Sequence, residues 1–73
     1  MGEPAPPRWP QPDGSPVSCR EKIKVLEENW AEVSEVVRDA FEDAVLMGVD
    51  AEAMRRRLAD LVASLAAPGR TRV

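Results

Sequence analysis

The side chain best suited to covalent chemistry in this 73-residue sequence is its single cysteine, Cys19. Three basic residues follow at Arg20, Lys22 and Lys24, and Cys19 lies at the predicted start of a helix. Both surroundings lower a thiol pKa, so a redox sensor or an intermolecular disulfide is one interpretation. We favour the other, a small apolar side chain buried in a helix seam, because Cys19 lies at a seam position next to the helix start. No histidine or second cysteine is present to assist the sulfur as a nucleophile.

The missing residue types exclude most enzyme classes. With no histidine and one cysteine, the chain cannot build the usual zinc spacings, a Glu-x-x-His di-iron motif or an intrachain disulfide. We therefore expect a protein that is not an enzyme, with no catalytic residue, no metal ion and no cofactor.

The charges are distributed unevenly around a net charge of -3. Residues 27–43 carry seven carboxylates against Arg38, whereas residues 55–73 carry five arginines against Asp60. So short a basic cluster cannot supply the many phosphate contacts of nucleic-acid binding, and its acidic neighbours argue against a membrane-surface helix. We expect neither nucleic acid nor membrane as a partner, although the acidic segment leaves a nucleic-acid mimic or inhibitor as an alternative function.

The sequence favours a cytoplasmic location. It contains no run of 18 apolar residues that could cross a membrane. Prolines and Glu3 stand near the N-terminus, where a signal peptide needs a basic and then an apolar stretch.

Residues 1–17 predict a disordered or polyproline-II arm, because most of the prolines lie there and proline prevents helix and sheet from propagating. Trp9 has three interpretations: a residue of this arm, part of a short proline-rich recognition motif, or a lid that folds back over Trp30. At the other end, Pro68 and Gly69 stop the last helix and begin a short basic tail, residues 68–73.

Two helices are predicted between the arm and the tail. Ser18 and Glu21 fit a capping box that starts a helix at about residues 18–47, and Gly48 and Asp50 fit its end and the cap of a second helix at about residues 51–66. Apolar residues recur in the first helix at the a and d positions of a heptad pattern: Cys19, Ile23, Leu26, Trp30, Val33, Val37, Ala40, Ala44 and Met47. The second helix has a similar seam: Ala51, Met54, Leu58, Leu61 and Leu65.

So tight a connection predicts an all-α fold, an antiparallel two-helix hairpin with a long first helix and a shorter second one. Folding about Val49 would place four pairs of seam residues opposite each other: Ala44 and Met54, Ala40 and Leu58, Val37 and Leu61, and Val33 and Leu65. It would also bring the arginines of residues 55–57 towards the carboxylates of residues 39–43.

The unequal helix lengths carry the functional prediction. The shorter helix cannot cover the first half of the longer one, so an apolar surface is left for another protein, with these contact residues: Ile23, Leu26, Trp30, Cys19 and Val33. Four carboxylates are second-tier candidates for a charged rim: Glu28, Glu32, Glu35 and Asp39. Two hairpins could form a four-helix bundle, or the surface could dock in a groove of a larger protein. We predict a small accessory or regulatory module that self-associates, docks, or does both.

Overall fold

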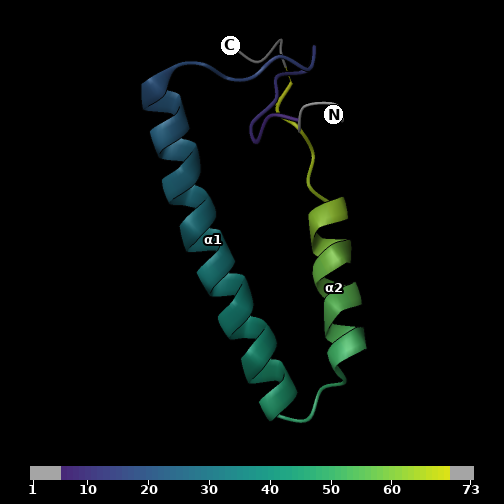
Figure 1. Ribbon diagram of the computed structural model, residues 1–73. Helices are drawn as coiled ribbons and strands as arrows, with labels where there is room; N and C mark the ends of the chain where they lie inside the picture. Colours follow the sequence, from purple (N-terminus) through teal and green to yellow (C-terminus); the bar gives the residue numbers. More distant parts are fainter. Residues whose placement is uncertain (1–5, 70–73) are drawn as a thin grey trace, which may run out of the picture. The chain divides into compact units, whose positions relative to one another are not determined.

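The computed structural model describes residues 6–69. These residues form two α-helices and no named strand: α1 spans Arg20–Leu46 and α2 spans Ala51–Ala63 (Figure 1). The predicted fold class, an antiparallel helical hairpin, is confirmed. Residues 1–5 of the predicted arm and residues 70–73 of the predicted tail lie outside the described residues.

The chain divides into two units, the first ending at Glu35 and the second beginning at Val36. The boundary falls inside α1, so each unit holds part of that helix. The first unit contains the proline-rich segment and the beginning of α1, and the second contains the end of α1 and all of α2. All five predicted contact residues belong to the first unit.

Helix α1 begins at Arg20, two residues after the predicted cap at Ser18. The backbone amide of Val17 donates to the carbonyl of Trp9 at 2.8 Å, which holds the preceding chain in a loop and delays the helix. The carbonyl of Cys19 then accepts the first helical hydrogen bond, from the amide of Ile23 at 3.0 Å. Cys19 therefore takes the N-cap position, which corrects the capping box predicted at Ser18.

The turn between the helices follows its predicted signals. Gly48 has a φ of 106°, a left-handed conformation that favours glycine. The amide of Val49 donates to the carbonyl of Ala44 at 2.9 Å, and the amide of Gly48 donates to that of Val45 at 3.0 Å, the pair of bonds that defines a Schellman ending. Asp50 caps α2, because its Oδ2 accepts from the amide of Ala53 at 2.8 Å.

Helix α2 ends at Ala63, earlier than the predicted residue 66. The Ser64 hydroxyl donates to the carbonyl of Leu61 at 2.7 Å, a local bond that competes with continuation of the helix. Leu61 and Leu65, predicted to complete the second seam, are 59% and 71% exposed. The hairpin therefore packs near its turn, and the far end of the second seam stays in contact with solvent.

The packed part of the second unit lies around Ala44, the one buried residue among residues 6–69, at 8% exposure. Phe41, which the predicted seam omits, is half-buried, and the guanidinium of Arg55 lies 5.1 Å from its ring centroid. Arg55 also pairs with Glu52 at 2.9 Å. The predicted approach of the residue 55–57 arginines to the carboxylates of residues 39–43 forms no ion pair in the described part of the chain.

The covered side chains of α1 form a slightly different row from the one that the heptad pattern predicts. The a positions Ile23 and Ala44 are covered, as expected. However, the half-buried set also includes e positions, whereas four predicted d positions are exposed. The covered e positions are Glu27, Ser34 and Phe41, and the exposed d positions are Cys19, Val33, Ala40 and Met47. An apolar row is thus left uncovered beside the row that packs. Within residues 6–69, neither helix has the length and apolar character needed to cross a bilayer.

Candidate protein-docking site

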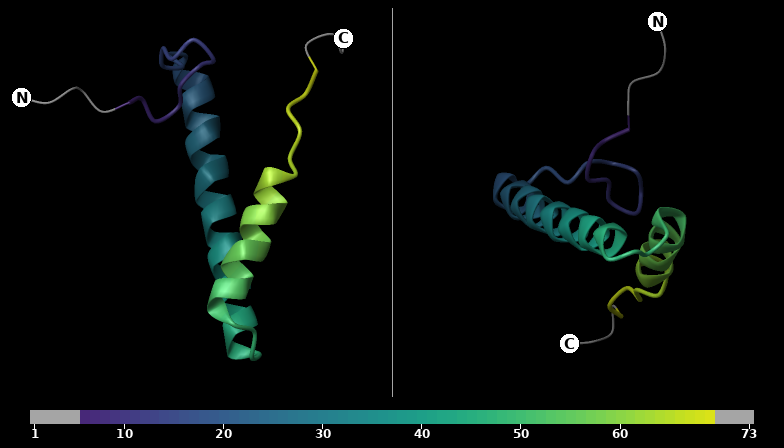
Figure 2. Two further views of the ribbon diagram at one scale, coloured as in Figure 1. Left: turned by 90° about the vertical axis from the view of Figure 1, so that its right-hand side faces the viewer. Right: turned by 90° about the horizontal axis from the view of Figure 1, so that it is seen from below.

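The proline-rich segment folds into a defined loop, residues 8–17, which we call the arm loop. It contains no helix, as its prolines predict, but it closes on itself (Figure 2). The amide of Gly14 donates to the carbonyl of Gln11 at 2.8 Å, and Gly14 has a φ of 91°. An isolated bridge joins Pro10 to Pro16, so the two ends of the loop lie together.

Side chains reinforce the turn of the arm loop. Oδ1 of Asp13 accepts from the backbone amide of Ser15 at 3.0 Å and from its hydroxyl at 2.6 Å. These two bonds, the side-chain bond first, hold the pKa of Asp13 below its usual 3.8. Nε2 of Gln11 donates to Oγ of Ser15 at 3.0 Å. These hydrogen bonds within the loop hold its conformation without any contribution from the helix.

The arm loop contacts α1 through a pair of side chains that we call the Arg8–Trp9 clasp. Nε1 of Trp9 donates to Oε2 of Glu27 at 2.8 Å, and Nε of Arg8 lies 2.8 Å from the same oxygen. The Trp9 and Trp30 rings meet edge to face, with centroids 6.1 Å apart and planes at 77°. The guanidinium of Arg8 also lies 5.6 Å from the centroid of the Trp9 ring. Of the three interpretations of Trp9, the fold-back onto Trp30 is the one observed.

The clasp is a modest interaction that leaves Trp30 accessible. An edge-to-face pair contributes about 0.5–1.5 kcal/mol beyond its area burial, and an exposed ion pair about 0–1 kcal/mol. The side chains of Arg8 and Glu27 are 60% and 42% exposed, which places their ion pair in the weak class. Trp30 is still 52% exposed although Trp9 packs against it.

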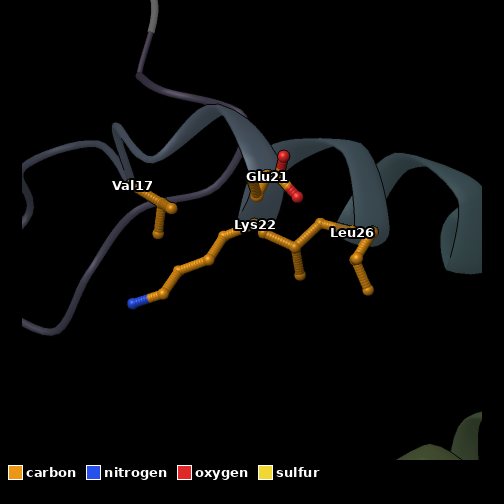
Figure 3. Close-up of a pocket in the computed structure, with 5 residues that line it drawn as sticks. Val17, Glu21, Lys22 and Leu26 are labelled. Carbon is orange, nitrogen blue, oxygen red and sulfur yellow. The ribbon is translucent and has the colours of Figure 1, made fainter.

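A shallow apolar groove lies beside the start of α1, lined by Val17, Glu21, Lys22, Val25 and Leu26. Figure 3 shows Val17, Lys22 and Leu26 directed to the same side, with the carboxylate of Glu21 turned away. Apolar carbon therefore lines most of the groove, and the ammonium group of Lys22 lies towards the arm loop. Such a concave apolar strip with polar edges suits a side chain from another protein.

The structure distributes the five predicted contact residues over two neighbouring sites. Leu26 lines the groove, and Trp30 contacts the Arg8–Trp9 clasp. Ile23 is half-buried, whereas Val33 is 51% exposed. Ile23, Leu26, Trp30 and Val33, with Cys19 at the edge, are called the docking surface below.

The predicted rim carboxylates are all exposed and belong to no ion pair of residues 6–69: Glu28, Glu32, Glu35 and Asp39. The first three lie in the first unit and Asp39 in the second. The carboxylate that does bind, Glu27, belongs to the acidic segment but not to the predicted rim. Its position three residues before Trp30, on the same helix face, is the signal that could have identified it.

Cys19 is exposed, so the favoured expectation of a buried apolar side chain is wrong. The N-cap position explains the difference, since a cap residue points along the helix end and not into a seam. Hydrogen bonds from the backbone amides of Lys22 and then Glu21 lower the pKa of the Cys19 thiol below its ordinary 9.0. The sulfur is therefore both accessible and easier to ionise than an ordinary cysteine.

The described residues form no cluster of metal-binding side chains. Nowhere in residues 6–69 do three or more potential metal-binding side chains come together, and every buried side-chain nitrogen or oxygen there has a hydrogen-bond partner. Comparisons of the chain with protein-family profiles, with curated proteins and with solved structures find no match.

Proposed function

We propose that this protein is a small, non-enzymatic interaction module that binds another protein chain through the docking surface. The observation that carries the proposal is the exposure of Trp30, 52% even with Trp9 packed against it. Trp is the residue type most enriched at the energetic centre of protein interfaces. The half-exposed Trp30 side chain gives a partner a large apolar surface to bind, and the shallow apolar groove beside it can accept a side chain of the partner.

The weak packing of the hairpin supports the same proposal. Ala44 is the one buried residue in the described part of the chain, and many larger apolar side chains are more than one-third exposed. Isolated helices and hairpins of this size are marginal in water without tertiary packing. Covering the apolar row of α1 that includes Val33 would supply the packing that the single chain lacks.

The rim carboxylates suggest the polar chemistry at the edge of such an interface. Glu28, Glu32 and Glu35 are exposed and make no ion pair within residues 6–69, so they are accessible to basic side chains of a partner. Charges at an interface rim raise the association rate and specificity more than the affinity. Both a second copy and a larger protein are candidate partners, and a cytoplasmic location is part of the proposal.

Sedimentation equilibrium and affinity capture on Trp30 variants test the proposal. We expect Trp30→Ala to weaken self-association or partner capture far more than Trp9→Ala, because Trp30 belongs to the docking surface and Trp9 to the arm loop. Trp30→Glu should abolish both. If the two alanine variants and the wild type behave alike in sedimentation and in capture, the docking surface is wrongly assigned.

A thiol-based regulator is the second candidate, and the exposed Cys19 with its lowered pKa favours it. Cys19 borders the docking surface, so its oxidation would change that edge or join two copies covalently. A dimer on a non-reducing gel after oxidation, together with loss of partner binding in Cys19→Ser, would support this role. Unchanged binding by the variant would dismiss it.

A further inference from the structure

We propose that Glu27 and Trp30 form a recognition site for a segment carrying a cation next to an aromatic ring, and that the arm loop is its built-in occupant. In the free protein the Arg8–Trp9 clasp fills the site. A partner segment of the same chemistry displaces the clasp and gains the docking surface. This inference rests on the proposed function and assigns to it a closed state and a class of ligand.

The geometry of the clasp defines the ligand chemistry. A single carboxylate oxygen, Oε2 of Glu27, receives two donors, the indole N–H of Trp9 and Nε of Arg8, each at 2.8 Å. The Trp30 ring lies edge to face with the indole. The site therefore binds a basic group and an aromatic ring that are held side by side, which is the arrangement that Arg8 produces by lying 5.6 Å from the Trp9 centroid.

The arm loop is suited to act as a displaceable occupant. Its own hydrogen bonds, from Val17 to Trp9 and from Gly14 to Gln11, close the loop without using α1. Within residues 6–69, the side-chain hydrogen bond and the ion pair that join the arm loop to α1 both end on Glu27, whose side chain is 42% exposed. Breaking the clasp therefore requires no unfolding of the loop or of the helix, and exposed charge pairs of this kind weaken as salt is added.

Tethering makes even a weak occupant effective. A segment joined to its site by a short linker competes at an effective concentration in the mM range. A site occupied in cis is available to another ligand in proportion to its open fraction, so a clasp that is open about one-tenth of the time lowers the apparent affinity about tenfold. The arm loop therefore sets a minimum affinity that a partner needs in order to displace it. Further contacts, such as those with the groove, would supply that affinity.

The first experiment follows the indole N–H resonance of Trp9 by NMR in the full chain. Glu27→Gln removes the charge that holds both donors, so we expect this resonance to move towards its position in a peptide of residues 6–17. The matched control is Glu28→Gln, which changes the adjacent glutamate, an exposed residue that belongs to no ion pair of residues 6–69. Equal spectra for wild type and Glu27→Gln would overturn the proposal.

The second experiment tests the site with the arm peptide as the ligand. Arg8→Ala/Trp9→Ala empties the site in the full chain, and unchanged helix content by circular dichroism verifies its fold. We expect the peptide of residues 6–17 to bind this variant about tenfold more tightly than wild type. Adding Trp30→Ala or Glu27→Gln should abolish that binding, and a peptide carrying both alanines should not bind.

The two outcomes separate this inference from the proposed function. If the peptide binds wild type and the emptied variant equally, or neither, the recognition site is wrong, whatever Trp30→Ala does to partner binding. If the peptide binds as expected, the recognition site stands even when sedimentation and capture reject the docking surface.

Discussion

At the scale of single residues, Trp30 and Glu27 show how one helix face serves two purposes. Trp30 was identified from its place in the apolar seam, because a large ring at an uncovered a position must meet something. Glu27 was not, because a carboxylate in an acidic segment is usually solvated. Its two donors come from residues 8 and 9, and no local sequence pattern connects them to residue 27.

The Cys19 thiol should show its helix-cap position in its reactivity. We expect its alkylation by iodoacetamide to have a midpoint below pH 9.0, because the amides of Lys22 and Glu21 favour the thiolate and lower the thiol pKa. In 8 M urea the helix end is lost, and the midpoint should rise towards that of an unstructured cysteine. A midpoint that urea does not move would contradict the capping role.

Asp13 gives the arm loop a predictable acid sensitivity. The pKa of Asp13 in the folded loop lies below the ordinary 3.8. Its carboxylate therefore contributes fully to the stability of the loop above pH 3.8, and this contribution is lost as the pH falls through the pKa of the folded loop. An NMR titration should therefore find the Asp13 midpoint below 3.8 in the wild type. Ser15→Ala removes the hydroxyl and should raise the midpoint, and an unchanged midpoint would show that the hydroxyl does not bind Asp13 in solution.

At the scale of elements, the two glycines with positive φ have different structural roles, which matched alanine substitutions can distinguish. Gly48, at 106°, ends α1, whereas Gly14, at 91°, closes the arm loop, and an added Cβ would meet nothing within 4 Å at either position. The cost of alanine is therefore conformational at both sites, about 1–2 kcal/mol. Gly48→Ala should lower the helical melting temperature, while Gly14→Ala should alter the Trp9 indole resonance and leave the melt nearly unchanged. The reverse pattern would contradict this assignment.

The elements that local chemistry specifies were predictable, and the others were not. Gly48 and Asp50 act as predicted because a Schellman ending and an N-cap are decided within a few residues. The row of covered side chains on α1 was predicted correctly for some a positions but not for the positions between them. The sequence spacing of a and d residues resembles that of a and e residues, so the two rows are hard to tell apart. Phe41 at e is larger than Ala40 at d, and its ring and the Arg55 guanidinium contact each other.

The turn at Pro12, Asp13 and Gly14 was missed because the segment was judged by its proline content, although this triplet is a common turn sequence.

At the scale of the whole molecule, stability should depend on what covers the apolar row. With Ala44 as the one buried residue of the described part, the single chain has little packing of its own. Binding that is specific to the folded state raises the melting temperature in proportion to the logarithm of partner concentration. If the partner is a second copy, the wild-type melting temperature should rise with protein concentration, and that of Trp30→Glu should not. A rise of equal size in both would place the contact elsewhere.

A site-specific photo-crosslinking comparison tests the docking surface most directly. A crosslinking side chain at Val33 lies on the uncovered apolar row, whereas one at Ala31, two residues earlier, lies on the opposite side of the same helix, and both native residues are exposed. In the native host, the proposal predicts strong crosslinks from Val33, either to a second copy or to one partner protein, and few from Ala31. Crosslinks of equal yield from the two positions would contradict it.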